Sequence, residues 1–427
     1  PPCSFRPRGL HCIEAHVVEA KSGEPLVGPF FDVAFWAQFA LPEILAKKGV
    51  CPLLYIPKMH VYQEAQLWHK VLKTIEQFYG IPEGTIKTVF LCETFPAVFQ
   101  LPRMIEAFEG RLIGVNCGRW DYLFSYVQVM AQHMKVNIDG KTVNTVLPSK
   151  HDVTTDVNLL KKYQVRTAQL CHKYGIMFIG GMNATLPSTH PDTSIREKEN
   201  HQILESSTKN KCDERQFYGA SKTWVAHIGL LEIAKKLVST PHSVPIDVNI
   251  RNILVTRPDL LHAPTPDQVP KPYNIDSFRR DMHVVLLYMA MYLLNRNGAV
   301  AVDNKMEDLA TAEISSSLLW FYVKHKILDR EIKESGGIET MTSEVARGVI
   351  DEIKSKHLRT QTISDTQLNA LVNALQKILV KLIHNSQQRP SLEKVLYVLG
   401  TRDDPYDKGR ALEVMRRSKR FPRAADA

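Results

Sequence analysis

Ile86-Lys-Thr-Val-Phe-Leu-Cys-Glu93 and Arg111-Leu-Ile-Gly-Val-Asn-Cys-Gly-Arg-Trp-Asp121-Tyr122 are the two segments that are most informative about the architecture of this chain. Each begins with a short apolar run of β-branched or bulky residues, with Gly or Pro nearby, which is typical of a buried strand. Between them, residues 97–109 carry apolar side chains at helical spacing. Strand, helix and strand of this length predict a βαβ unit with two parallel strands.

Each predicted strand is followed by a carboxylate, Glu93 after the first and Asp121 after the second. Because neighbouring parallel strands end at the same edge of a sheet, we expect these two side chains to lie close together. Mg²⁺ prefers a few carboxylates together with waters or substrate oxygens, so the pair is a candidate magnesium site. The alternative is that both residues are solvated loop acids.

The length and composition indicate a globular chain with more than one domain. The 427 residues suffice for a large core and predict two domains. No apolar run approaches the roughly 20 residues that span a membrane. The formal charge of +9 is compatible with nucleic acid, an acidic surface or small anions as partners. Basic residues are scattered except near residues 416–423, which we interpret as a solvated tail, and no interleaved aromatic and basic patch favours nucleic acid.

The cysteine pattern is informative about the redox compartment, and the first residues are informative about the N-terminus of the protein. Seven cysteines with no CxxC pair argue against a disulfide framework and for a reducing compartment. No secretory signal is visible. The sequence starts with Pro1 instead of Met, from which we expect that the N-terminus is cut.

Strand and helix patterns alternate from the beginning of the chain to about residue 240. At least five such units predict an α/β fold with a parallel sheet, and a TIM (β/α)8 barrel fits them better than an open sheet. We assign residues 1–256 to this catalytic domain and 257–274 to a Pro-rich linker. Residues 275–427 form a predicted all-helical domain without a convincing strand. Within the first domain, the polar stretch 187–221 is interpreted as a mobile flap.

Several further residues are candidates for chemistry, each with an ordinary alternative. Arg8 could clamp a carboxylate or an enolate through its planar fork, or be a surface residue. Asp308 lies at a predicted helix start, where the helix dipole favours an anion, and its alternative role is a helix cap. Lys58 is a site residue or an ion-pair partner. Gly180-Gly181-Met182, which we expect to close a strand, allows close approach of a ligand or forms a plain turn.

These residues belong to a series of motifs that resembles malate synthase, in its shorter glyoxylate-cycle isoform. The order and spacing of the matching pieces span most of the chain. They are Arg6-Pro-Arg-Gly9, Ile56-Pro-Lys-Met59, Gly80-Ile-Pro-Glu-Gly-Thr-Ile86, Glu93-Thr94, Asn116-Cys-Gly-Arg-Trp-Asp-Tyr122, Gly180-Gly-Met182, Thr223-Trp-Val-Ala-His227 and Met306-Glu-Asp-Leu-Ala-Thr-Ala-Glu-Ile-Ser315.

The resemblance implies a TIM barrel with a C-terminal helical plug, Mg²⁺ as cofactor, and glyoxylate and acetyl-CoA as substrates. It implies that Glu93 and Asp121 bind the metal, that Arg8 polarises the reacting oxygens and that Asp308 is the catalytic base. It also implies sites for the two substrates. Those for glyoxylate are Arg8, Gly118, Arg119, Trp120 and Asp121, and those on the acetyl-CoA side are Met182, Pro187 and Met306.

The resemblance further implies a peroxisomal or glyoxysomal location, with the cytoplasm and mitochondria as alternatives, and leaves a homo-oligomer open. We expect that the family's N-terminal segment and first barrel strand, which would lie before Pro1, are absent, which puts the closure of the barrel in question. The chain also has Gly219-Ala-Ser-Lys-Thr-Trp224 where the family has Gly-His-Asp-Gly-Thr-Trp. Two other functions stay open: a malyl-CoA or citramalyl-CoA lyase, and an inactive truncated relative that acts as a binding protein.

Overall fold

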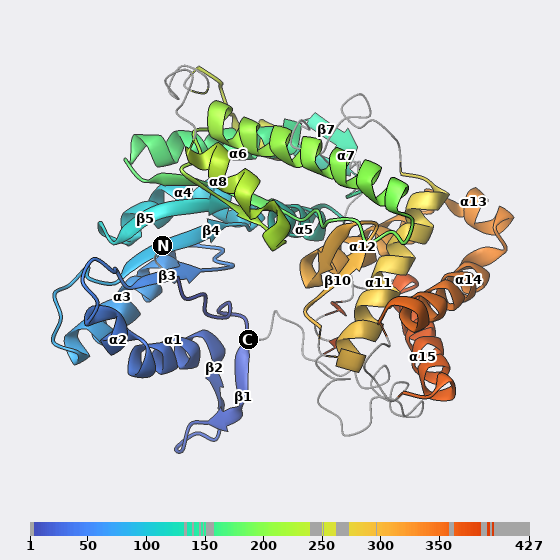
Figure 1. Ribbon diagram of the computed structural model, residues 1–427, viewed down its shortest axis with the longest axis horizontal. Helices are drawn as coiled ribbons and strands as arrows, with labels where there is room; N and C mark the ends of the chain where they lie inside the picture. Colours follow the sequence, from blue (N-terminus) through green and yellow to red (C-terminus); the bar gives the residue numbers. More distant parts are fainter. Residues whose placement is uncertain are drawn as a thin grey trace. The chain divides into compact units, whose positions relative to one another are not determined.

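The structure is a computed structural model. It describes residues 4–131, 135–138, 141–144, 147, 149–150, 158–239, 250, 252–261, 273–295, 297–357, 363–385, 391–392 and 395–396. The chain forms two compact units, which are considered separately below (Figure 1). The first unit contains residues 1–126 and 159–260, and the second contains 127–158 and 261–427.

A curled sheet of five parallel strands in the order β3-β4-β5-β8-β9 forms the centre of the first unit. Helices follow the strands along the chain: α3 packs beside α4, and α8 packs beside α7 and β9. The strands are β3 (Leu53–Ile56), β4 (Lys87–Cys92), β5 (Leu112–Cys117), β8 (Met177–Asn183) and β9 (Lys222–Val225). The helices are α3 (Tyr62–Phe78), α4 (Phe95–Ala107), α5 (Arg119–Met130), α6 (Asn158–Lys173), α7 (Thr193–Cys212) and α8 (Leu231–Ser239).

The predicted βαβ unit is present as β4, α4 and β5. The two strands are parallel, and Cys92 pairs with Cys117 at their carboxyl ends. Leu53, Tyr55, Val89, Leu91 and Ile179 from neighbouring strands form one buried apolar cluster. Period-2 alternation therefore places these side chains on a shared face of the sheet.

A mixed α/β fold with a curled parallel sheet agrees with the prediction, and further pairing extends it at one edge. Phe5 forms a parallel bridge to Leu54, so the segment before residue 8 lies beside β3. Closure into eight strands, and the absence of a first strand, stay predictions. A hairpin of β1 (Ile13–Val18) and β2 (Pro25–Val27) precedes α1 (Gly28–Phe39) and α2 (Leu41–Leu45).

Two expectations for the first unit are wrong. Residues 187–221, expected to be irregular, contain the 20-residue helix α7 and a π-helical turn, while their role as a mobile flap stays a prediction. Asp192 caps α7 by accepting the backbone N–H groups of Ser194 and Ile195, and the charged helix formers that follow are compatible with an exposed helix. Gly180 and Gly181 lie inside β8 instead of closing a strand.

The second unit is mainly helical, as the sequence predicts, but it also contains two hairpins. Its helices are α11 (Ile275–Asn295), α12 (Leu309–Lys324), α13 (Asp329–Glu334), α14 (Gly337–Glu352) and α15 (Asp365–Ile383). One hairpin joins β6 (Lys135–Ile138) and β7 (Lys141–Asn144), and the other joins β10 (Ala299–Val302) and β11 (Lys305–Asp308). The prediction of a domain without strands is therefore wrong.

The β10–β11 hairpin escaped the sequence analysis because its strands have only four residues each. Asp303 and Asn304 form the connection with φ values of 48° and 57°. Two central residues with positive φ are typical of a type I′ hairpin turn, and Asn and Asp tolerate this region better than most residues. Part of the predicted linker is also regular, since Arg257–Leu261 form the short helix α10, while 262–272 lie outside the described residues.

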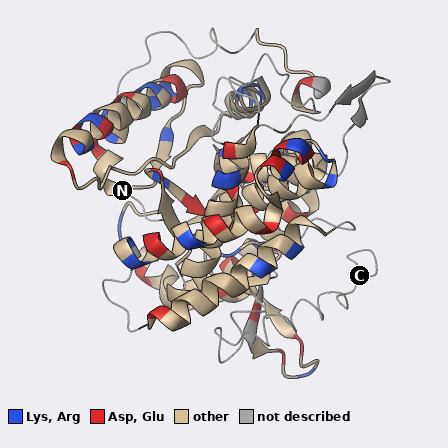
Figure 2. Ribbon diagram, turned by 90° about the vertical axis from the view of Figure 1, so that its right-hand side faces the viewer, with Lys and Arg blue, Asp and Glu red and all other residues tan. Residues whose placement is uncertain are grey.

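Charge and cysteines agree with the sequence analysis where the structure describes them. Figure 2 shows basic and acidic residues interspersed along the ribbon of the helices, and the basic run at 416–423 lies outside the described residues. No described helix is long and apolar enough to cross a membrane. The six described cysteines are all free thiols.

Candidate active site

Glu93 lies directly after β4 and is almost completely buried. One carboxylate oxygen, Oε1, accepts the backbone N–H of Lys58 at 2.8 Å. The other, Oε2, is buried without a hydrogen-bond partner among the described residues. Lys58 has a φ of +55°, a conformation that is uncommon for residues other than glycine. The backbone at the end of β3 is therefore held in a rare conformation in which it binds Glu93.

Asp121 lies in the first turn of α5, after β5, and its carboxyl group contacts that of Glu93. The ammonium group of Lys58 forms an ion pair with the Asp121 carboxylate. The sequence prediction that the two strand-end carboxylates lie close together is confirmed. Lys58 forms an ion pair, as one of its two open roles predicts, and its role as a site residue stays a prediction.

The two carboxyl groups are incompletely compensated by positive charge. Burial, and then the negative charge of Asp121, raise the pKa of Glu93 well above its ordinary value. Burial also acts to raise the pKa of Asp121, but Lys58 and the hydrogen bond with Glu93 outweigh burial and lower it. Without a bound cation, a proton on Glu93 therefore reduces the negative charge of the pair. Two clustered carboxylates with one unpartnered oxygen fit a hard divalent cation such as Mg²⁺.

Gly118 is required by the close approach of Glu93. A Cβ atom at residue 118 would lie 2.8 Å from Cβ of Glu93 and 3.1 Å from its Oε2. The same glycine precedes α5, whose first N–H groups are directed at the N-terminal end of the helix, where an anion is favoured. The start of α5 can thus present backbone donors beside the carboxylate pair.

Arg119 connects the start of α5 to β8. Its Nη2 donates to the carbonyl oxygen of Met182 at 2.9 Å and lies 3.8 Å from the Glu214 carboxylate. A Cβ atom on Gly181 would lie 2.7 Å from Nε of Arg119, so this glycine leaves room for the guanidinium. The contacts give Arg119 a structural role. Its neighbour Trp120 has a buried Nε1 without a partner among the described residues.

A buried ion pair next to Arg119 was missed in the sequence analysis. Nζ of Lys211 in α7 lies 2.9 Å from Glu214 and donates to the carbonyl oxygen of Gly181 at 2.7 Å. Burial lowers the pKa of Lys211 to about 8 in spite of the Glu214 charge. Thr223 donates to the same carboxylate at 2.7 Å, and a Cβ atom on Gly180 would collide with it. The i, i+3 spacing of Lys211 and Glu214 was the available signal, but it fits an exposed pair equally well.

Arg8 and Arg6 differ in their partners. Arg8 binds Asp32 through Nε at 2.9 Å and Nη2 at 2.6 Å, and Nη2 also donates to Glu14 at 2.9 Å. The charge of Arg6, by contrast, acts on both Glu93 and Asp121. Arg8 is therefore held by two carboxylates outside the pair, while Arg6 has a weak electrostatic effect on the pair, and the predicted role of Arg8 stays a prediction.

Asp308, in the second unit, ends β11 and caps α12. Its Oδ1 accepts the N–H of Thr311 at 3.1 Å, and the Thr311 hydroxyl accepts the N–H of Asp308 at 2.9 Å. Glu307 is buried and forms an ion pair with Lys150. Met306 lies in the same strand and is half-buried. The predicted helix start at Asp308 is confirmed, and this capping box is the ordinary role that the sequence left open.

Met182 and Pro187, expected on the acetyl-CoA side, both lie at or beyond the end of β8. Met182 belongs to the strand and pairs with Trp224 of β9. The ring of Pro187 lies near Gly229, where a Cβ atom would be 3.4 Å from it. Both residues are half-buried, and their roles stay predictions.

Comparisons with known proteins match both units. A family model described as malate synthase, TIM barrel domain, matches residues 4–262, and a second, malate synthase, C-terminal, matches residues 274–386. Malate synthase A of Escherichia coli is 34% identical over 332 residues, which are 75% of this chain and 56% of the relative. The glyoxysomal malate synthase of Candida tropicalis is 31% identical over 83% of this chain and 60% of the relative.

The chain spans about half the length of the curated relatives that it matches. Among solved structures, a Haloferax volcanii malate synthase in a ternary complex with pyruvate and acetyl-CoA is 14% identical, with a TM-score of 0.43. That match covers 77% of this chain and 75% of the solved chain.

Proposed function

The chain belongs to the malate synthase family, and on this basis we propose that it condenses acetyl-CoA with glyoxylate and releases malate and CoA. The observation that carries the proposal is the pair of contacting carboxylates, Glu93 and Asp121, on neighbouring strand ends. A Mg²⁺ ion held by this pair would supply Lewis-acid polarisation of the glyoxylate aldehyde. The N–H groups at the start of α5, from Gly118 to Asp121, would bind the glyoxylate carboxylate.

The reaction needs a base and a fixed positive charge, because a thioester methyl group is a weak acid. We assign the base to Asp308, which would take a proton from the methyl group of acetyl-CoA. The enolate carbon then forms a bond with the aldehyde carbon of glyoxylate, while the C=O π electrons pass to the aldehyde oxygen, which takes up a proton and gives the thioester malyl-CoA. Water subsequently cleaves the thioester, giving malate and CoA and making the sequence irreversible.

For the positive charge at the enolate oxygen, we propose Arg6 in place of Arg8. The Arg8 guanidinium is already bound by Asp32 and Glu14, whereas the charge of Arg6 acts on the carboxylate pair. A pre-oriented guanidinium stabilises developing negative charge without rearranging during the reaction. In this proposal Arg8, held by Asp32 and Glu14, helps to position the segment that carries Arg6.

The lyase alternative is not favoured, since both matching family models are malate synthases. We place the reaction in the glyoxylate cycle. Because glyoxysomal enzymes are among the relatives, we propose a peroxisomal location, which fluorescence microscopy of the tagged chain would test.

The decisive experiment incubates the purified chain with acetyl-CoA, glyoxylate and Mg²⁺ and follows free CoA thiol and malate. We expect the two products in equal amounts, dependent on glyoxylate and on Mg²⁺. Glu93→Gln should lose both activity and Mg²⁺ binding, because an amide cannot replace a metal-binding carboxylate. The matched control is Glu43→Gln, at an exposed position of α2.

Three outcomes would overturn the proposal. Accumulation of malyl-CoA without malate would indicate a lyase. CoA release that does not require glyoxylate would indicate a thioesterase. A folded chain without turnover would indicate a binding protein.

A further inference from the structure

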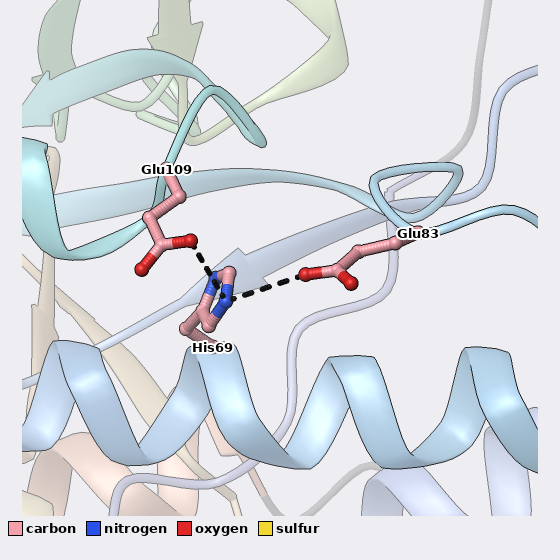
Figure 3. A group of neighbouring side chains, drawn as sticks. All are labelled: His69, Glu83 and Glu109. Carbon is pink, nitrogen blue, oxygen red and sulfur yellow. Dashed lines mark ion pairs between the residues drawn. The ribbon is translucent and has the colours of Figure 1, made fainter.

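His69, Glu83 and Glu109 converge from three segments of the first unit (Figure 3). His69 lies in α3, Glu83 lies in the turn before β4, and Glu109 lies between α4 and β5. Nε2 of His69 is 3.7 Å from Oε1 of Glu83 and 3.6 Å from Oε2 of Glu109. Figure 3 shows the imidazole ring between the two carboxylates.

His69 is buried but makes no hydrogen bond within the described part of the chain. The residue is 8% exposed, and Nδ1 is buried without a partner. Nε2 points at the two carboxylates, yet both oxygens lie beyond the usual length of an N–H···O hydrogen bond. Buried polar groups in folded proteins normally have partners, so hydrogen bonding does not account for this buried imidazole, whose Nδ1 has no partner and whose Nε2 faces two carboxylates at more than hydrogen-bond length.

The spacing of the three ligand atoms fits a metal polyhedron better than a hydrogen bond. In a four-coordinate Zn²⁺ site with bonds of about 2.0–2.2 Å, neighbouring ligand atoms lie about 3.3–3.6 Å apart. Of the two distances from His69 Nε2, the one to Glu109 is at the upper end of this range and the one to Glu83 is 0.1 Å above it, and all three atoms lie within 4.8 Å of one another. A fourth position stays open for water.

The surrounding charges also suit a divalent cation. Lys73 binds the other oxygen of Glu83, Oε2, at 2.9 Å, which leaves Oε1 directed at His69. Ligating carboxylates are commonly held by such outer partners. Arg111, which is close to Glu83, is neutralised by a 2.7 Å ion pair with Glu76. Two carboxylates facing one lysine leave a net negative charge.

We propose that His69, Glu83 and Glu109 form a structural metal site for Zn²⁺ or a similar divalent transition metal, separate from the magnesium site. One imidazole nitrogen with two carboxylate oxygens is a ligand set that suits zinc better than Mg²⁺. Glu83 and Glu109 precede β4 and β5, so the site lies at the amino-terminal edge of the sheet, whereas Glu93 and Asp121 follow the same strands. The metal would tie α3 to two loops and stabilise the first unit.

The test titrates Zn²⁺ into metal-free full-length chain in excess Mg²⁺, using a competing chromophoric chelator. Glu93→Gln serves as the background, so that zinc at the carboxylate pair cannot be counted. We expect one Zn²⁺ per chain and a melting temperature that rises with Zn²⁺. Glu109→Gln, at an exposed position, should weaken binding by more than the roughly 10- to 100-fold that losing an outer-shell partner costs.

His69→Asn should abolish binding, and Co²⁺ should give visible absorption bands of a four-coordinate site only when His69 and Glu109 are present. Glu43→Gln is the matched control and should bind Zn²⁺ like its background. Unchanged zinc affinity in folded Glu109→Gln would overturn the proposal and leave a plain ion-pair cluster. The same holds if zinc binds only to chains that retain Glu93. Neither result depends on enzymatic activity.

Discussion

At the carboxyl edge of the sheet, the residue type at several positions is explained by the side chain that it contacts. Glu93 and Asp121 would repel each other strongly without Lys58, a proton and the nearby Arg6. A side chain at Gly118 would collide with Glu93. Side chains at Gly180 and Gly181 would likewise collide with Glu214 and Arg119, respectively. The site therefore depends on small residues that make room for large charged ones.

Substitution of Arg6 and of Arg8 should have different effects, the first on activity and the second on stability. Arg6→Gln should reduce kcat/KM by about 10²–10³-fold, because it removes the charge that we propose for the enolate oxygen, with little change in melting temperature. Arg8→Gln should chiefly lower the melting temperature, because Asp32 and Glu14 lose their partner. Steady-state kinetics and thermal unfolding of both variants make the comparison. Loss of activity in Arg8→Gln at unchanged stability, with near-normal activity in Arg6→Gln, would return the catalytic role to Arg8.

Among the helices and strands, α12 begins with a residue to which two roles are assigned. Asp308 caps the helix through Thr311, and we propose it as the base as well. Helix capping needs only a side-chain oxygen, which asparagine also has, whereas proton abstraction needs a carboxylate. Substitutions can therefore separate the two roles.

Asp308→Asn should retain stability while losing exchange of the acetyl-CoA methyl protons with solvent. Asp308→Ala should lose this exchange and also about 1 kcal/mol of stability, since the cap is removed. Proton exchange followed by NMR, together with denaturant unfolding, distinguishes the variants. If the Asp308→Asn variant exchanges methyl protons at the wild-type rate, Asp308 is excluded as the base.

Helices α11 and α14 are joined by a pair that should respond to acid. Nε2 of His283 lies 2.8 Å from the Glu352 carboxylate, and this histidine, against the effect of burial and with help from Lys356, lowers the pKa of Glu352 to about 2. A carboxyl group whose pKa is depressed from 4.5 stabilises the fold above that value. The contribution is lost as the pH falls from about 4.5 towards 2.

Glu352→Gln should therefore be less stable than the wild type at about pH 6, and the difference should shrink as the pH falls towards about 3. Urea midpoints measured across this range test the effect. Glu344→Gln, which removes the exposed partner of Arg279 on the same helix, is the control. A constant difference between Glu352→Gln and wild type at all pH values would contradict the proposed linkage.

Over the whole molecule, the chain passes between the two units more than once. Residues 127–158 leave the first unit and group with the second. Within the second unit, buried Lys150 pairs with buried Glu307, and the Tyr322 hydroxyl donates to the Leu147 carbonyl oxygen at 2.7 Å. The second unit is therefore completed by a segment from the first half of the sequence. The predicted domain boundary at residue 275 stays a prediction.

Removing the lysine of this pair should destabilise the second unit strongly. Lys150→Met leaves the Glu307 charge buried without its partner, which typically costs about 3–5 kcal/mol. The double variant Lys150→Met/Glu307→Leu should recover most of this loss, because neither member of the pair is then left buried without the other. Denaturant unfolding of the wild type, both single variants and the double variant gives the coupling energy. A double variant as unstable as Lys150→Met would mean that the pair is not the cause.

Elements with local signals could be predicted from the amino-acid sequence alone. Apolar runs and helical periodicity located β4, α4, β5 and the start of α12, and parallel pairing brought Glu93 and Asp121 to one edge. The type of fold followed from the same alternation, because a buried strand and an amphipathic helix differ in period.

The contacts between side chains that are distant in the sequence are determined by the tertiary structure. Arg8 binds Asp32, Arg6 acts on the carboxylate pair, and His69 lies between Glu83 and Glu109. A polar stretch likewise forms α7, and the short apolar run Ala299–Val302 pairs with the mostly charged segment Lys305–Asp308 in the β10–β11 hairpin. The physical reason is that periodicity reports which face of an element is buried, while the partner on that face is set by packing between segments far apart in the chain.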